Sequence, residues 1–268
     1  MPLNSPSYFE EMVRVGMIQI AYKEIVPEKI ESPLPIIFLH DSLGSISVWK
    51  EFPKAVAEQA NLKAIVYDRE GYGKSDPFSN PERDNRYLEL QADFLIQFLD
   101  QLKINECILF GHSDGGSISL IAGAKYPERI KGIITEGAHV FVEEITLAGI
   151  REAKEAFKTT DLKTKLIRHH GEKVDALFDA WTETWLTPEF KKWNIEEFLE
   201  QIKCPVLTIY GEKDEYGTLL QAESVAGKVK GYSEKLIIPG IGHTPHKEAK
   251  EETIKASGEF IRKRILKN

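Results

Sequence analysis

Short apolar runs rich in β-branched residues recur along the chain, separated by longer amphipathic stretches. They span residues 17–25, 35–40, 62–68, 106–112, 130–135, 205–211 and 235–239. In residues 36–39 every position is apolar, which is typical of a parallel strand covered by helices on both faces. Apolar residues follow helical spacing in 88–102, 117–126 and 253–266. This alternation predicts an α/β fold with a mostly parallel, doubly wound sheet.

The strand rhythm stops in residues 140–199, where the sequence becomes charged and helical, and it resumes near Cys204. We therefore predict one α/β core, formed by residues 1–139 and 200–268, with residues 140–199 inserted as a helical lid. Trp181 and Trp185 lie four residues apart on a predicted lid helix, so their rings share a face. That face either lines a substrate pocket or packs the lid onto the core.

Composition narrows the class of protein. The formal net charge of −7 and the lack of a long basic run disfavour nucleic-acid binding. The two cysteines, Cys107 and Cys204, lie at the edges of apolar runs and are interpreted as buried thiols without a disulfide framework. No apolar segment approaches the ~20 residues needed to span a bilayer, and the first residues do not resemble a signal peptide. We expect a cytoplasmic monomer or homodimer that acts on a small molecule, without membrane attachment.

The run 108–112 enters the sequence Gly111-His112-Ser113-Asp114-Gly115 and leaves into a predicted helix. Glycines two positions before and two positions after the serine permit a tight turn, and such a nucleophile elbow holds the serine in a strained backbone conformation above the sheet edge. The following helix directs its first N–H groups toward the same place. We predict that Ser113 is a nucleophile.

A serine nucleophile requires a neighbouring base. His243 directly follows the last predicted strand, in a loop with two glycines, and is the predicted base. His246 is three residues further along, and supporting the loop is the role we expect for it. We see no metal-ligand spacing and predict neither a metal nor an organic cofactor.

The base requires a carboxylate that fixes its tautomer and stabilises the imidazolium. Asp214 follows the strand 205–211 at its carboxyl end, where sites in parallel sheets are built. Glu215 and Glu136 are rival candidates.

An oxyanion hole needs two N–H donors. We expect one from the backbone of Asp114 and the other from the loop after the strand 35–40, at Ser42, with Leu43 as the alternative.

These residues, in the order Ser113, Asp214 and His243, resemble the α/β-hydrolase superfamily over essentially the whole chain. The motif 67–76 (Tyr-Asp-Arg-Glu-Gly-Tyr-Gly-Lys-Ser-Asp) belongs to the same resemblance. Residues 113–116 and 137–142 are similar to the biphenyl-hydrolase-like, or valacyclovir-hydrolase, subgroup, which includes α-amino-acid ester hydrolases. The family usually has His-Gly in the oxyanion loop, whereas this chain has His40-Asp41.

The predicted function is a serine esterase that cleaves a small carboxylic ester through an acyl-enzyme. Asp114 could favour an α-amino ester if its carboxylate faces the pocket, or it could bond a neighbouring loop instead. Carbon–carbon bond hydrolysis of aromatic meta-cleavage products and thioester hydrolysis use the same machinery. A non-catalytic ligand receptor is the alternative from another class.

Overall fold

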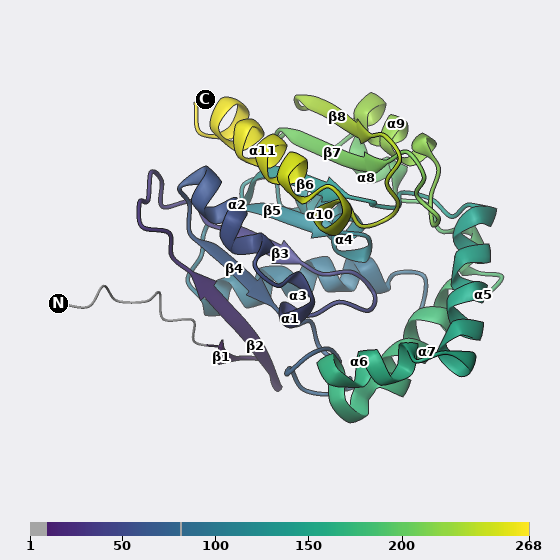
Figure 1. Cartoon of the computed structure of the whole chain (residues 1–268). Helices are drawn as coiled ribbons and strands as arrows, with labels where there is room; N and C mark the ends of the chain where they lie inside the picture. Colours follow the sequence, from purple (N-terminus) through teal and green to yellow (C-terminus); the bar gives the residue numbers. More distant parts are fainter. Residues whose placement is uncertain (1–9, 81, 268) are drawn as a thin grey trace.

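The centre of the molecule is an eight-stranded sheet in a computed structural model that describes residues 10–80 and 82–267 (Figure 1). Its order is β1-β2-β4-β3-β5-β6-β7-β8. The β1–β2 and β2–β4 pairs are antiparallel, and every other pair is parallel. The strands are β1 (Glu10–Val15), β2 (Ile18–Ile25), β3 (Ile36–Leu39), β4 (Ala64–Tyr67), β5 (Cys107–His112), β6 (Ile130–Glu136), β7 (Val206–Gly211) and β8 (Ser233–Ile238).

Helices cover both faces of the sheet and bury two separate apolar clusters (Figure 1). Helices α2 (Phe52–Ala60) and α11 (Lys250–Phe260) contribute to one cluster, and α3 (Tyr87–Gln101), α4 (Asp114–Lys125) and α9 (Leu219–Lys228) to the other. In β3, Ile36 and Phe38 belong to the first cluster and Ile37 and Leu39 to the second. This explains why the run is apolar at every position. Short helices α1 (Ile46–Trp49) and α10 (Pro245–Glu248) and a π-helical turn at Ile261–Ile265 complete the core.

The mostly parallel sheet with helices on both faces, predicted from the sequence, is confirmed, and a strand overlaps each of the seven apolar runs. The strand β1 was not predicted. It lies at the sheet edge, pairs only with β2, and leaves most of its side chains exposed, so it lacks the apolar signal of the buried strands. Gly16, with φ +61°, makes the turn between the two.

Residues 140–199, which we call the lid segment, connect β6 to β7. They form α5 (Glu144–Thr159), α6 (Leu162–His170), α7 (Val174–Trp185), α8 (Glu196–Leu199) and two 3₁₀ turns, Gly171–Lys173 and Phe190–Lys192. The two ends of the segment lie together, because Phe141 and Asn194 form an antiparallel bridge and Ile195 N donates to Val140 O at 2.8 Å. The division into a core and a functional lid stays a prediction.

Two further predictions concern the two cysteines and the possibility of a membrane-spanning helix. Cys107 and Cys204 are free thiols, and Cys107 is buried as predicted, whereas Cys204 is only partly buried. Burial of its thiol nevertheless raises the pKa of Cys204 to about 12. Within the described ranges, every helix is too short or too polar to cross a bilayer.

Candidate active site

Ser113 occupies the turn between β5 and α4. Its backbone has φ 53° and ψ −119°, a conformation that a residue with a side chain adopts only under strain. The flanking glycines leave room for this turn. A Cβ on Gly111 would lie 2.1 Å from Gly115 O, and one on Gly115 would lie 2.1 Å from Leu39 O. The strained turn between strand and helix that the sequence predicted at Ser113 is therefore present, and the role of Ser113 as nucleophile stays a prediction.

His243 and Asp214 form a buried pair. The imidazole Nδ1 lies 2.9 Å from Asp214 Oδ1 and 2.8 Å from Oδ2. Asp214 follows β7, and its Oδ1 also accepts from the backbone N–H groups of Tyr216 and Gly217, at 2.8 and 3.2 Å. Burial alone would lower the pKa of His243, but the Asp214 carboxylate raises that pKa above its ordinary value. The two contacts hold the ring with Nδ1 toward the acid, so that Nε2 is on the side of the ring that faces away from Asp214.

The two rival carboxylates have other partners. Glu215 Oε2 accepts from the backbone N of His243 at 3.1 Å, so it holds the loop rather than the ring. Glu136 Oε2 lies 2.7 Å from Nδ1 of His246, and both side chains are buried. His246 thus supports the loop through Glu136, and within the described ranges no group of three or more His, Cys, Asp or Glu is placed to hold a metal.

The loop after β3 is fixed through the carbonyl of Asp41. That oxygen lies 2.7 Å from Nδ1 of His40 and accepts from Arg69 Nη2 at 2.8 Å. His40 Nε2 accepts from Arg69 N at 3.0 Å, so the His40 proton must be on Nδ1, which donates to Asp41 O. In a trans peptide the C=O and N–H point in opposite directions, and the Ser42 N–H therefore points away from His40 and Arg69.

The carboxylate of Asp114 is 1% exposed. Its Oδ2 accepts from Tyr87 Oη at 3.0 Å and lies 3.8 Å from Arg69 Nη1. Trp185 Nε1 donates to the same Tyr87 oxygen at 2.8 Å. One oxygen of the Asp114 carboxylate is thus bound by its neighbours, whereas its Oδ1 is buried without a hydrogen-bond partner in the described part of the chain. Whether this carboxylate meets a substrate stays a prediction.

Ser113 and His243 line one cavity of about 150 Å³. Of the residues predicted for the site, Ser42, Leu43, Asp114, Trp181 and Trp185 line it too. Glu215, a rival candidate for the acid, lines it as well, and the rest of its wall was not predicted from the sequence: Asp41, His139, Thr146, Ile150, Tyr216 and Thr244. Helices α5 and α7 of the lid segment therefore form part of the wall. Among the described residues, the lining includes three acidic ones, Asp41, Asp114 and Glu215, and neither lysine nor arginine.

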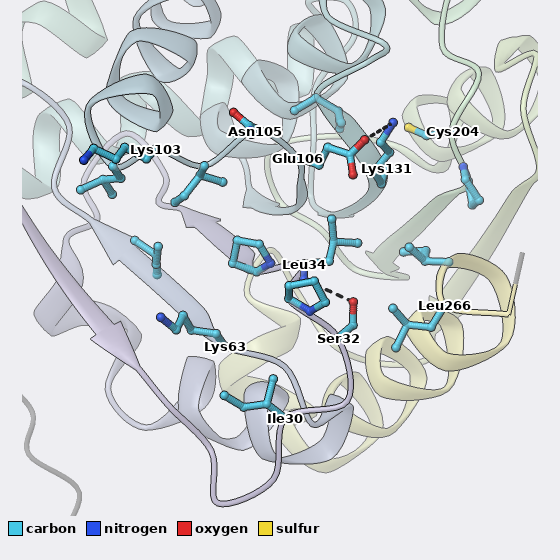
Figure 2. A pocket seen from close by; sticks show the side chains of 18 of the residues that line it. Ile30, Ser32, Leu34, Lys63, Lys103, Asn105, Glu106, Lys131, Cys204 and Leu266 are labelled. Carbon is cyan, nitrogen blue, oxygen red and sulfur yellow. Dashed lines mark hydrogen bonds and ion pairs between the residues drawn. The ribbon is translucent and has the colours of Figure 1, made fainter.

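A larger open hollow of about 1380 Å³ lies at the opposite edge of the sheet, where the parallel strands begin. Figure 2 shows its wall, with Ile30, Leu34 and Leu266 beside Lys63 and Lys103. In the part of the chain that the structure describes, its lining contains Ser32 but no histidine. Because a serine there has no base, we place the candidate active site at the smaller cavity.

A family model described as alpha/beta hydrolase fold matches residues 35–180, more than half of the chain. The chain therefore belongs to this family and is a hydrolase of the α/β fold.

Three known proteins illustrate the relationship. The human serine hydrolase BPHL is 29% identical over 208 residues, covering 74% of this chain and 68% of its own. The 2-hydroxy-6-oxononadienedioate/2-hydroxy-6-oxononatrienedioate hydrolase of Escherichia coli K12 is 26% identical over 208 residues, covering 68% and 71%. A serine hydrolase structure from the polyaromatic-hydrocarbon-degrading bacterium Cycloclasticus zankles superposes with a TM-score of 0.79 at 17% identity, over 96% of this chain and 98% of that one. The similarity to BPHL confirms the subgroup resemblance seen in the sequence.

Proposed function

We propose that the protein is a serine hydrolase that cleaves carboxylic esters of small, cationic molecules through an acyl-enzyme. The observation that carries this proposal is that Ser113 and His243 line one cavity, while Asp214 contacts the ring of His243 from behind at 2.8 Å. A strained serine, a base whose Nε2 faces away from the acid, and a buried acid behind that base are the components of nucleophilic acyl transfer.

The reaction proceeds in two halves. The Ser113 hydroxyl attacks the ester carbonyl carbon while its proton passes to Nε2 of His243, and Asp214 stabilises the resulting imidazolium. The same proton then passes to the leaving alkoxide as the tetrahedral intermediate collapses to the acyl-enzyme. In the second half, water attacks the acyl carbon and gives a proton to His243. Collapse of the second tetrahedral intermediate breaks the bond from the acyl carbon to Ser113 Oγ, which takes this proton back, and the carboxylic acid leaves.

The oxyanion of each tetrahedral intermediate is assigned to the N–H groups of Asp114 and Ser42. Asp114 is the first residue of α4, so its N–H and the positive end of the helix dipole are directed toward the elbow. The orientation of Ser42 N–H follows from the fixed carbonyl of Asp41. Two preorganised donors are each expected to contribute roughly 3 to 4 kcal/mol.

The charge of the cavity supports a cationic substrate. Arg69 lies 3.8 Å from Asp114 and offsets its charge, and Lys247 acts on Asp41 from outside the cavity. Within the described ranges, Asp41 and Glu215 nevertheless share a cavity wall that contains no lysine or arginine. A substrate ammonium is attracted to such a wall, whereas a carboxylate is repelled. The Escherichia coli relative is named for a dicarboxylate, a type of substrate that this wall disfavours. An α-amino ester fits the charge best.

Replacing Ser113 tests the reaction. We expect Ser113→Ala to abolish both fluorophosphonate labelling and ester turnover, because the attacking oxygen is gone. The matched control is Ser224→Ala. Ser224 lies on α9, outside the cavity lining, and its hydroxyl donates to Glu196, so this variant should be labelled and should turn over the ester normally. Labelling and turnover retained by Ser113→Ala would refute the proposed nucleophile.

A substrate panel tests the class of substrate. An α-amino ester and its des-amino analogue, compared at pH 7, should differ in kcat/KM by about tenfold or more in favour of the amino ester, since about 1.4 kcal/mol suffices for that ratio. Equal values would refute the cationic preference. A thioester and a dienone complete the panel. Faster turnover of either would reassign the reaction, and a ligand that raises Tm without any turnover would indicate a receptor.

A further inference from the structure

One buried side chain connects the lid segment to the predicted oxyanion loop. His170 is the last residue of α6 and is 2% exposed. Its Nε2 lies 3.0 Å from the carbonyl oxygen of Leu43, and its Nδ1 lies 3.0 Å from the backbone N of Gly73. The ring therefore bridges two core loops that are about 30 residues apart in the sequence.

The two contacts fix which nitrogen of His170 carries the proton. A backbone N–H only donates, so Nδ1 must accept from Gly73 and cannot be protonated. A carbonyl only accepts, so Nε2 must carry the proton and donate it to Leu43. Both bonds require the neutral ring, and burial agrees with this by lowering the pKa of His170 to about 4.

Two neighbours of His170 in the lid segment also form hydrogen bonds to the core near this ring. Lys173 Nζ donates to the carbonyl oxygens of Tyr72 and Gly73, at 3.3 and 2.8 Å, and also to that of Ser75. Nδ1 of His169 lies 2.7 Å from Ser47 Oγ. The loop 71–75 is thus fixed to the lid segment independently, and His170 is supported on its Gly73 side.

The oxyanion loop is consequently held from both ends. His40 and Arg69 fix the carbonyl of Asp41, immediately before Ser42, and His170 fixes the carbonyl of Leu43, immediately after it. His40 and Arg69 belong to the core, whereas His170 belongs to the lid segment. Without His170, the peptide between Leu43 and Gly44 would lose this side-chain anchor.

We propose that His170 is a positioning residue that holds the Ser42 N–H in place for the oxyanion, so that the lid segment is a working part of the oxyanion hole. This rests on the proposed ester hydrolysis. His170 acts through the loop and does not itself touch the substrate.

The experiment compares His170→Ala with the conservative His170→Gln, whose amide can still donate and accept. We expect His170→Ala to lower kcat by between about tenfold and about a hundredfold with KM within about twofold, because a displaced donor costs part of what a lost donor costs. His170→Gln should recover most of kcat. Arg168→Ala, an exposed change on the same helix, is the control and should leave both constants unchanged.

A second measurement separates positioning from a general loss of structure. Affinity for a boronic acid, which forms a tetrahedral adduct with the active-site serine, should fall by the same factor as kcat/KM. An unchanged kcat, or a change confined to KM or Tm, would overturn the proposal, and if His170→Ala does not fold, the kcat and adduct affinity of His170→Gln decide. A wild-type protein without ester turnover or Ser113 labelling would instead refute the proposed function.

Discussion

At the scale of single residues, the environment of His243 sets the pH dependence of the proposed reaction. The imidazole must be neutral to accept the Ser113 proton, and Asp214 raises its pKa above 6.5. Activity should therefore rise with pH through this raised pKa. The Asp214 carboxylate thus has two effects on His243. It favours the protonated imidazolium, and it orients the neutral imidazole that accepts the Ser113 proton.

Asp214→Asn tests this relation. Removing the negative charge lowers the pKa of His243, so the acidic limb of the kcat/KM profile should move to lower pH. The plateau should fall by roughly 10³ to 10⁴ because the orienting acceptor is lost. Profiles of the two proteins from pH 4 to 9 provide the measurement, and a limb that stays in place would contradict the role of Asp214.

The sequence predicted Ser113, His243 and Asp214 because each directly follows a recognisable strand. It could not exclude Glu215 and Glu136 as the acid of the site, because each also follows a predicted strand and the sequence does not show where a side chain points. Asp214 faces the imidazole, whereas Glu215 faces the backbone of the same histidine. His170 escaped prediction altogether, because its partner Leu43 is 127 residues away and no local pattern marks it.

At the scale of elements, the elbow depends on close approach between α4 and the ends of β3 and β5. Gly115 faces the backbone oxygens of Leu39 and His40, at 2.1 and 2.8 Å from the position of an added Cβ. Backbone atoms cannot move aside as a flexible side chain can. The first turn of α4 would therefore have to shift, and the Asp114 N–H would shift with it.

Gly115→Ala should lower the free energy of unfolding by about 1 to 3 kcal/mol, the usual cost of overpacking, and reduce turnover strongly. Gly227→Ala makes the same change in α9, where an added Cβ meets nothing within 4 Å, and should be neutral or stabilise by up to about 1 kcal/mol. Urea unfolding of both variants measures the difference. Equal stabilities would show that α4 is free to adjust.

Most of the sheet could be predicted because its central strands are buried on both faces and are apolar throughout. The edge strand β1 could not, because its exposed side chains follow no buried pattern. The helical nature of residues 140–199 was evident from the sequence. Which of its side chains reach the cavity depends on tertiary packing, and Thr146 and Ile150 of α5 were missed for that reason.

At the scale of the whole molecule, five buried histidines other than His243 have lowered pKa values, and burial is the first cause of each: His40, His112, His139, His170 and His246. The unfolded chain takes up their protons near pH 6.5, but the folded chain does so only at lower pH. Their contribution is therefore present above pH 6.5 and is lost as pH falls toward the folded values, about 3 for His112 and about 4 for His170.

The free energy of unfolding should accordingly fall between pH 7 and pH 5, with each such histidine contributing up to about 1.4 kcal/mol per pH unit. Glu136 opposes this, because burial raises its pKa to about 8 and its contribution is lost as pH rises from 4.5. The five histidines outweigh it. Urea unfolding followed by tryptophan fluorescence measures the balance, and a free energy independent of pH over this range would contradict it.

The bridge between Phe141 and Asn194 brings the two ends of the lid segment together beside the sheet. An inserted segment whose two ends lie together can change in length or sequence without altering the distance between β6 and β7. The lid segment could therefore be replaced as a unit during evolution. New walls for the cavity, and hence new substrates, could be acquired in this way. Any replacement would, however, have to bring its own donor to the carbonyl of Leu43, which limits how freely specificity can evolve apart from rate.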